Sequence, residues 1–135
     1  DHFHQLMTLE EVPFTIQVLQ TKNALVHKAY LIESSQNKVV YAPHGAQLKK
    51  DINLKMDAVI TTTLRYQLPF FLGGTINLGI GKALQLQKQL KADLLIDTHN
   101  EDKKGEGLVS LFARRKFYSD NAVLNLKIGE FVDLN

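Results

Sequence analysis

The chain has no cysteine among its 135 residues, so disulfides, thiolate metal sites and a cysteine nucleophile are excluded. It has no apolar run near the ~20 residues needed to cross a bilayer, and no segment typical of a signal or transit peptide. It lacks a Gly-x-Ser-x-Gly motif, so we do not expect a serine hydrolase. The chain also lacks a strong excess of charge of either sign, because 16 Lys and Arg are scattered among 14 Asp and Glu, for a net charge of +2. We therefore expect no membrane span and no nucleic-acid partner.

Hydrophobic residues make up 44% of the chain, which lets a polypeptide of this length bury a core of its own. We predict a single domain over residues 1–135. Its first third is predicted to be antiparallel, because residues 13–20 and 26–33 alternate apolar with polar side chains and residues 38–42 form another short strand. Turn residues 34–37 join the last two segments into a β-hairpin.

The middle of the chain is predicted to form a β-loop-α-β unit. After a short helical segment at 47–53, residues 57–63 form a buried-type strand, and a loop with Pro69, Gly73 and Gly74 follows. Apolar residues recur at helical spacing over 79–91, and residues 93–98 form the next strand. Strands joined in this way are parallel, with a right-handed crossover.

A second helix is predicted at 105–116, and short strands are predicted at 122–126 and 131–134. Strands therefore dominate the first third, and helices alternate with strands afterwards. This order predicts the α+β class, with a mixed β-sheet and helices packed on it.

The strand within residues 94–101, Leu-Leu-Ile-Asp-Thr-His-Asn-Glu, runs directly into Asp97, His99 and Glu101. Ligands of open α/β sheets bind at the carboxyl ends of strands, so these side chains are candidates for metal ligation or proton transfer. The same residue types also build loops and cap helices, and that interpretation stays open. The strand 38–42 also ends in a histidine, His44, held in the turn Pro-His-Gly.

Other histidines and glycines have ordinary structural explanations. His27 is predicted to lie within a strand, where a packed or outward-facing role is expected. His2 and His4 have a spacing that could bind metal, but they lie at a chain terminus, which is commonly frayed. The glycines between Gly73 and Gly81 could cradle a phosphate, or could simply form a tight loop before a helix.

Five segments follow one another in an order that is more specific than any one of them. They are Pro-Phe-Thr-Ile (13–16), Ala-Tyr-Leu-Ile-Glu (29–33), Lys-Val-Val-Tyr-Ala-Pro-His-Gly (38–45), Asp-Ala-Val-Ile-Thr (57–61) and Leu-Ile-Asp-Thr-His-Asn-Glu (95–101). Together they resemble the carboxyl-terminal half of a metallo-β-lactamase-fold hydrolase. The motif Tyr-x-Pro-His-Gly in particular is similar to a divergent branch of that superfamily found in cyanobacteria and chloroplasts.

The resemblance implies that the chain is the carboxyl-terminal portion of a longer domain, equal to half of an αββα sandwich. It also implies hydrolysis of a small-molecule ester, lactone or phosphoester by water bound to zinc or another divalent metal. His99 matches the last His ligand of the family, and His44 stands at the position of its bridging Asp. Asp97 or Glu101 would then orient a ligand or accept a proton. The implied location is cytoplasmic, with the plastid stroma as the alternative.

The chain also departs from the family pattern. Asn23 stands at the position of a family His, and the His-x-His-x-Asp-His motif is absent. A zinc ion that activates water needs about three protein ligands, so the remaining ones would come from a missing amino-terminal half or from a homo-oligomer. Otherwise the fold binds no metal.

The second hypothesis is a non-catalytic member of the fold that binds a ligand or a protein. Such a module could use the old cleft or the apolar loop 68–72, Leu-Pro-Phe-Phe-Leu. An exposed loop of this kind would be an interaction patch. We expect Phe70 and Phe71 to be buried in the core instead.

Overall fold

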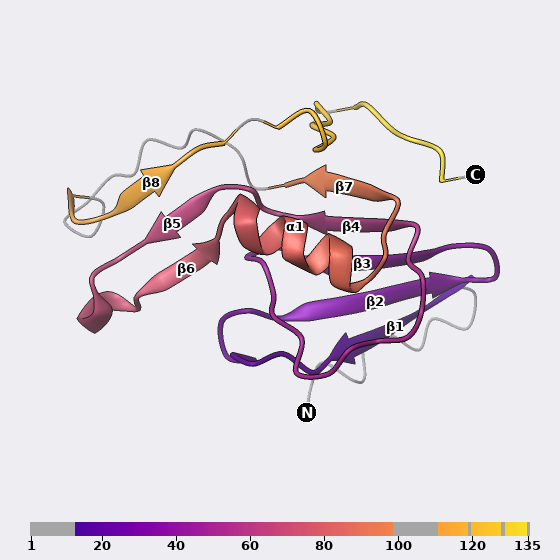
Figure 1. The fold of residues 1–135 in the computed structure, drawn as a ribbon, viewed down its shortest axis with the longest axis horizontal. Coiled ribbons are helices and arrows are strands. Elements are labelled where there is room, and N and C mark those ends of the chain that lie inside the picture. Colours follow the sequence, from indigo (N-terminus) through magenta and orange to yellow (C-terminus); the bar gives the residue numbers. More distant parts are fainter. Residues whose placement is uncertain (1–12, 99–110, 119, 128, 135) are drawn as a thin grey trace.

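The computed structural model describes residues 13–98, 111–118, 120–127 and 129–134. These residues form a five-stranded mixed sheet, a three-stranded antiparallel sheet and an α-helix (Figure 1), which confirms the α+β class. The elements in chain order are β1 (Phe14–Leu19), β2 (Ala29–Ser34), β3 (Lys38–Ala42), β4 (Ala58–Thr61), β5 (Arg65–Gln67), the 3₁₀-helix η1 (Phe70–Leu72), β6 (Thr75–Leu78), α1 (Ile80–Gln89), β7 (Leu94–Asp97) and β8 (Arg114–Lys116). No helix among the described residues is long and apolar enough to span a bilayer.

The larger sheet has the strand order β1-β2-β3-β4-β7. Its first three strands pair antiparallel, which confirms the predicted hairpin, and Asn37 N donates to Ser34 Oγ at 2.9 Å in the turn between β2 and β3. Strands β3, β4 and β7 pair in parallel. Because α1 lies between β4 and β7 in the chain, the predicted β-loop-α-β unit is confirmed.

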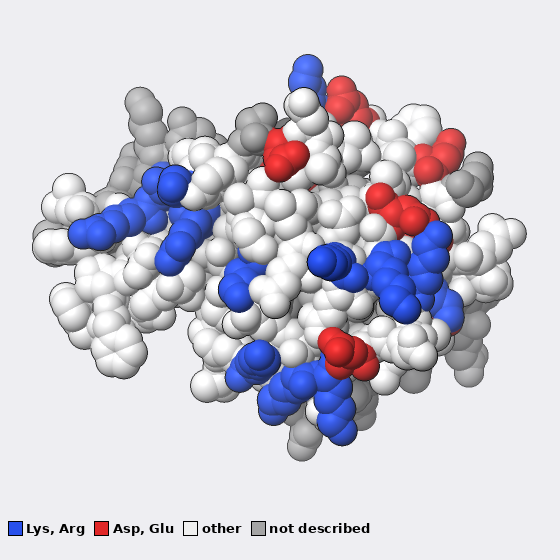
Figure 2. All heavy atoms as spheres, in the orientation of Figure 1, with Lys and Arg blue, Asp and Glu red and all other residues white. Residues whose placement is uncertain are grey.

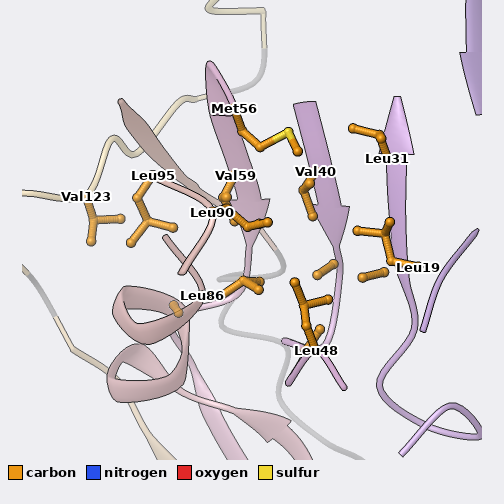
Figure 3. Close-up of a cluster of buried hydrophobic side chains, with 14 residues drawn as sticks. Leu19, Leu31, Val40, Leu48, Met56, Val59, Leu86, Leu90, Leu95 and Val123 are labelled. Carbon is orange, nitrogen blue, oxygen red and sulfur yellow. The ribbon is translucent and has the colours of Figure 1, made fainter. Parts of the chain in front are cut away.

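One face of this sheet packs against α1 and against the segment that connects β3 to β4. The helix presents Ala83 and Leu86, and Leu90 follows at its carboxyl end, so a single apolar stripe meets the sheet. Figure 3 shows Leu86 and Leu90 in one cluster with Val59 of β4 and Leu95 of β7. The buried core consists of Leu19, Ala29, Leu31, Val40, Ala42, Ala46, Leu48, Met56, Val59, Ala83, Leu86, Leu90, Leu95 and Val123.

The opposite face of the same sheet is apolar as well. Side chains alternate between the two faces of a strand, so the register places two complete rows of residues on this face. The rows are Ile16, Ile32, Val39, Ala58, Leu94 and Val18, Tyr30, Tyr41, Ile60, Ile96. At the β1 edge, Ile16 is 37% and Val18 63% exposed, whereas Ala58 and Ile96 are buried and the other six residues are half-buried. We call these ten residues the open face.

The three-stranded sheet has the order β6-β5-β8 and lies where the sequence predicted only a loop. A β-hairpin links β5 to β6, and η1 forms its tip, where Leu68 N donates to Gly74 O at 2.8 Å. Phe70 is 96% and Phe71 82% exposed, so the predicted burial of this loop is wrong. The tip projects away from the larger sheet (Figure 1), which leaves the two rings without a surface of the core to pack on.

Three further predictions of secondary structure are wrong. Residues 47–53 are not helical, because Gln47 accepts a hydrogen bond from Lys22 N and the backbone of Leu48 bridges to Thr21. The helix predicted at 105–116 is wrong in its last residues, because Arg114–Lys116 form strand β8; Leu111 is helical, and residues 105–110 lie outside the described residues. The strands predicted at 122–126 and 131–134 are irregular, apart from a single parallel bridge between Leu124 and Ile96.

Candidate functional site

The three parallel strands of the larger sheet end at one level. The register pairs Ala42 with Thr61, and Thr61 with Asp97. His44 follows Ala42 after one residue, so His44 and Asp97 both lie at the carboxyl edge of the sheet. Their predicted positions at strand ends are confirmed, and their chemical roles remain predictions.

A tight turn holds the backbone of His44. Gly45 N donates to Ala42 O at 2.9 Å, so Pro43 and His44 are the central residues of the turn. Gly45 has φ +82°, which favours glycine, and a Cβ there would lie 3.0 Å from Leu78 Cβ. The carbonyl of His44 accepts a hydrogen bond from Leu78 N at 3.1 Å. The end of β6 therefore fixes this turn against the sheet.

The imidazole of His44 is oriented by the neighbouring residue of β6. Its Nδ1 lies 2.9 Å from Oδ1 of Asn77, whose side chain is buried. An amide oxygen only accepts hydrogen bonds, so His44 Nδ1 is the donor in this contact. A histidine held in this way through one nitrogen is prepared to bind a metal, or to accept a proton, with the other.

The carboxylate of Asp97 is bound to Thr63, which follows β4 and is 1% exposed. Oδ1 accepts from Thr63 N at 2.8 Å, and Oδ2 accepts from Thr63 Oγ1 at 2.6 Å. Both carboxylate oxygens therefore help to fix the ends of β4 and β7 against each other. In this arrangement Asp97 acts first as a positioning group.

The rest of the edge is formed by buried threonine side chains that make hydrogen bonds with backbone atoms. Thr61 Oγ1 donates to Ala42 O at 2.7 Å, and Thr62 Oγ1 accepts from Leu64 N at 3.2 Å. These bonds tie the two hydroxyls to the backbone at the end of β4, which lies between β3 and β7 in the sheet.

Charged pairs lie at the opposite, amino edge of the sheet. Lys55 Nζ is 2.8 Å from Asp93 Oδ2, and this hydrogen bond and ion pair raise the pKa of the exposed Lys55 ammonium. Asp57 Oδ2 accepts from Lys38 N at 2.6 Å. These contacts join strand starts and do not reach the His44 edge.

Several predicted site residues lie outside the described residues: His99, Glu101, His2 and His4. Among the residues that are described, no three His, Asp or Glu side chains are placed to share a metal ion. His44, oriented by Asn77, is the candidate zinc ligand that the described residues contain. Completing a centre would require His99 and at least one more ligand.

His27 has the packed role expected of it, although it precedes β2 instead of lying inside a strand. Its buried Nε2 lies 3.0 Å from Ile76 O, another backbone group of β6. The predicted glycine loop is divided between two places. Gly73 belongs to the hairpin tip, whereas Gly79 and Gly81 line a hollow of about 490 Å³ at the start of α1.

Asn77 was not anticipated from the sequence, although it orients the one candidate ligand that the structure describes. It lies 33 residues from His44 on a strand that the sequence analysis assigned to a loop. Asn77 could have been found only if residues 75–78 had been predicted as a strand beside the His44 turn.

No protein-family model, curated protein or solved structure matches this chain.

Proposed function

We propose that this chain is a hydrolase-like protein of the metallo-β-lactamase fold whose site lies at the carboxyl edge of β3, β4 and β7. Its substrate would be a small-molecule ester, lactone or phosphoester. The observation that carries the proposal is the contact between His44 Nδ1 and Asn77 Oδ1, because metal-ligating histidines are commonly oriented by a partner on their other ring nitrogen.

The proposed ligands are His44 and His99. In the sequence, His99 comes two residues after Asp97, and His44 comes two residues after Ala42, the residue at the same level of the sheet. Zinc or another divalent cation bound there would supply an activated water. Asp97 would position the end of β7 through Thr63, and Glu101 would be the proton acceptor.

The open face supports the resemblance to half of an αββα sandwich. Parallel strands are normally covered on both faces, and here the face opposite α1 presents two rows of apolar side chains. A sandwich of two sheets packs such inner faces against each other. We propose that a further sheet layer, from additional chain or from a second copy, covers the open face and supplies the remaining ligands.

Metal content tests the proposal most directly. Protein purified without metal-affinity steps is expected to contain about one equivalent of zinc, manganese or iron per complete site. We expect His44→Ala and His99→Ala each to lose that metal and the hydrolysis of a panel of aryl esters, lactones and phosphoesters. His27→Gln is the matched control, because it removes an imidazole elsewhere and keeps an N–H donor for Ile76 O.

The opposite result would be protein with only trace metal that gains no activity when zinc, manganese or iron is added. That result favours the second candidate, a non-catalytic member of the fold that binds a ligand at the same edge. The bonds of both Asp97 oxygens to Thr63 favour this candidate, because they give the carboxylate a structural role.

A further inference from the structure

The free end of the smaller sheet carries a cluster of exposed apolar side chains. Phe70 is 96% and Phe71 82% exposed at the β5–β6 tip, and Leu111 is 76% and Phe112 58% exposed just before β8. Leu68 and Phe112 line one hollow, so the two segments lie side by side. We call Phe70, Phe71, Leu111 and Phe112 the apolar tip.

Cations lie directly behind the apolar tip. Arg65 is on β5, and Arg114, Arg115 and Lys116 form β8, where all three side chains are exposed. The described part of the chain contributes no Asp or Glu to β5, η1, β6 or β8. On the face drawn in Figure 2, blue spheres gather where β5 and β8 lie.

The order of the apolar tip and the basic residues along the smaller sheet indicates which kind of surface they bind. The pair Gln67–Arg114 is nearest to the tip, and the pair Arg65–Lys116 is farther back. With a rise of about 3.4 Å per residue, the cations begin within roughly 10 Å of the aromatic rings. Apolar groups in front and cations one layer behind match the hydrocarbon and phosphate layers of an anionic bilayer.

A protein partner fits this surface less well. Protein interfaces are broad patches with an apolar centre and a polar rim around it in the same plane. Here Phe70 and Phe71 stand at the end of a projecting hairpin with Leu111 and Phe112 beside it, and the charged residues that the structure describes on β5, β6 and β8 are all basic.

We propose that the apolar tip inserts into the surface of an anionic lipid bilayer while Arg65, Arg114 and Lys116 bind lipid phosphates. The contact is peripheral and independent of the proposed hydrolytic site. Each basic residue near an anionic surface strengthens binding about fivefold at low salt, so Arg114 and Lys116 together account for roughly 25-fold.

Co-sedimentation of the full chain with vesicles tests the proposal. We expect binding to vesicles of phosphatidylcholine mixed with phosphatidylserine, little binding to phosphatidylcholine alone, and release at high salt. Phe70→Ser/Phe71→Ser should weaken binding at least tenfold. Arg114→Gln/Lys116→Gln should weaken it by the roughly 25-fold expected above.

The controls change equally exposed residues elsewhere. Leu25→Ser replaces a 92% exposed leucine, and Lys49→Gln/Lys50→Gln removes two exposed cations that follow the bridge between Leu48 and Thr21, outside the smaller sheet. Both should bind vesicles as the parent does, and far-UV circular dichroism should show that every variant is folded.

Two results overturn the proposal. One is the absence of vesicle binding that depends on the tip: the parent sediments equally with and without anionic vesicles, or it binds no better than the tip variants. The other is a parent that self-associates in sedimentation velocity and becomes monomeric as Phe71→Asp without vesicle binding, which would make the tip a protein interface.

Discussion

The contact between Asp97 and Thr63 leads to a quantitative prediction about stability. Asp97→Ala removes the acceptor of two hydrogen bonds and leaves the N–H and hydroxyl of the buried Thr63 without it. A hydrogen bond to a charged group contributes about 1.5–3 kcal/mol. Asp97 is half-buried and water can replace part of the loss, so we take the lower value for each bond. The free energy of unfolding should fall by about 3 kcal/mol.

Partial substitutions separate the two bonds. Thr63→Val keeps the backbone N–H bond and loses the hydroxyl, so it should cost about 1.5 kcal/mol. Asp97→Asn should cost less than Asp97→Ala, because its oxygen still accepts from Thr63 N while the hydroxyl can accept from its amide. In the double variant Asp97→Ala/Thr63→Val, the cost should stay near 3 kcal/mol, which gives a coupling energy of about 1.5 kcal/mol.

Urea unfolding followed by far-UV circular dichroism measures these differences through the midpoint at constant slope. Asp93→Ala is the control, because this exposed carboxylate also borders β7 and should leave the midpoint unchanged. A loss below about 0.5 kcal/mol for Asp97→Ala would mean that water serves Thr63 as well as the carboxylate does, and the assignment of Asp97 as a positioning group would be refuted.

Two further predictions concern the turn and the core. Gly45→Ala should destabilise the protein by about 2–3 kcal/mol, since φ is +82° and the new Cβ meets Leu78 at 3.0 Å, whereas Gly74→Ala, at φ +69° in open space, should cost only about 1 kcal/mol. Equal melting shifts for the two variants would show that Leu78 does not crowd the turn. Met56→Ala removes a fully buried side chain and should lower the free energy of unfolding by about 2–5 kcal/mol, while Leu25→Ala, at 92% exposure, should leave it unchanged. If Met56→Ala had the same melting temperature as the parent in differential scanning calorimetry, the contribution of the Met56 side chain to stability would have been overestimated.

The larger sheet could be predicted because its signals are local. Alternation marks β1 and β2, turn residues mark the hairpin, and helical spacing marks α1. The smaller sheet could not be predicted in the same way. Its strands β5 and β8 have three residues each, too short to show a period, and β8 reaches β5 from a distant part of the chain. Gly73 and Gly74 were correctly assigned to a turn, but the strands on either side of that turn were missed.

The candidate site was also predictable only where its signals are local. His44 and Asp97 could be placed at strand ends because a polar residue after an apolar run marks the end of a strand. Their partners could not be placed, because Thr63 and Asn77 approach through pairing between elements far apart in sequence. The segment 47–53 was assigned to a helix for a related reason, since its pairing with Thr21 is invisible to local propensity.

The mixed topology of the larger sheet also sets an order of assembly. Tyr30 meets Tyr41 by closing a short hairpin, whereas Val39 must find Ala58 across an irregular connection and Ala58 must find Leu94 beyond β5, β6 and α1. Loop closure costs entropy before distant contacts return any stabilisation. The antiparallel third should therefore form first, and docking of β7 should limit the folding rate.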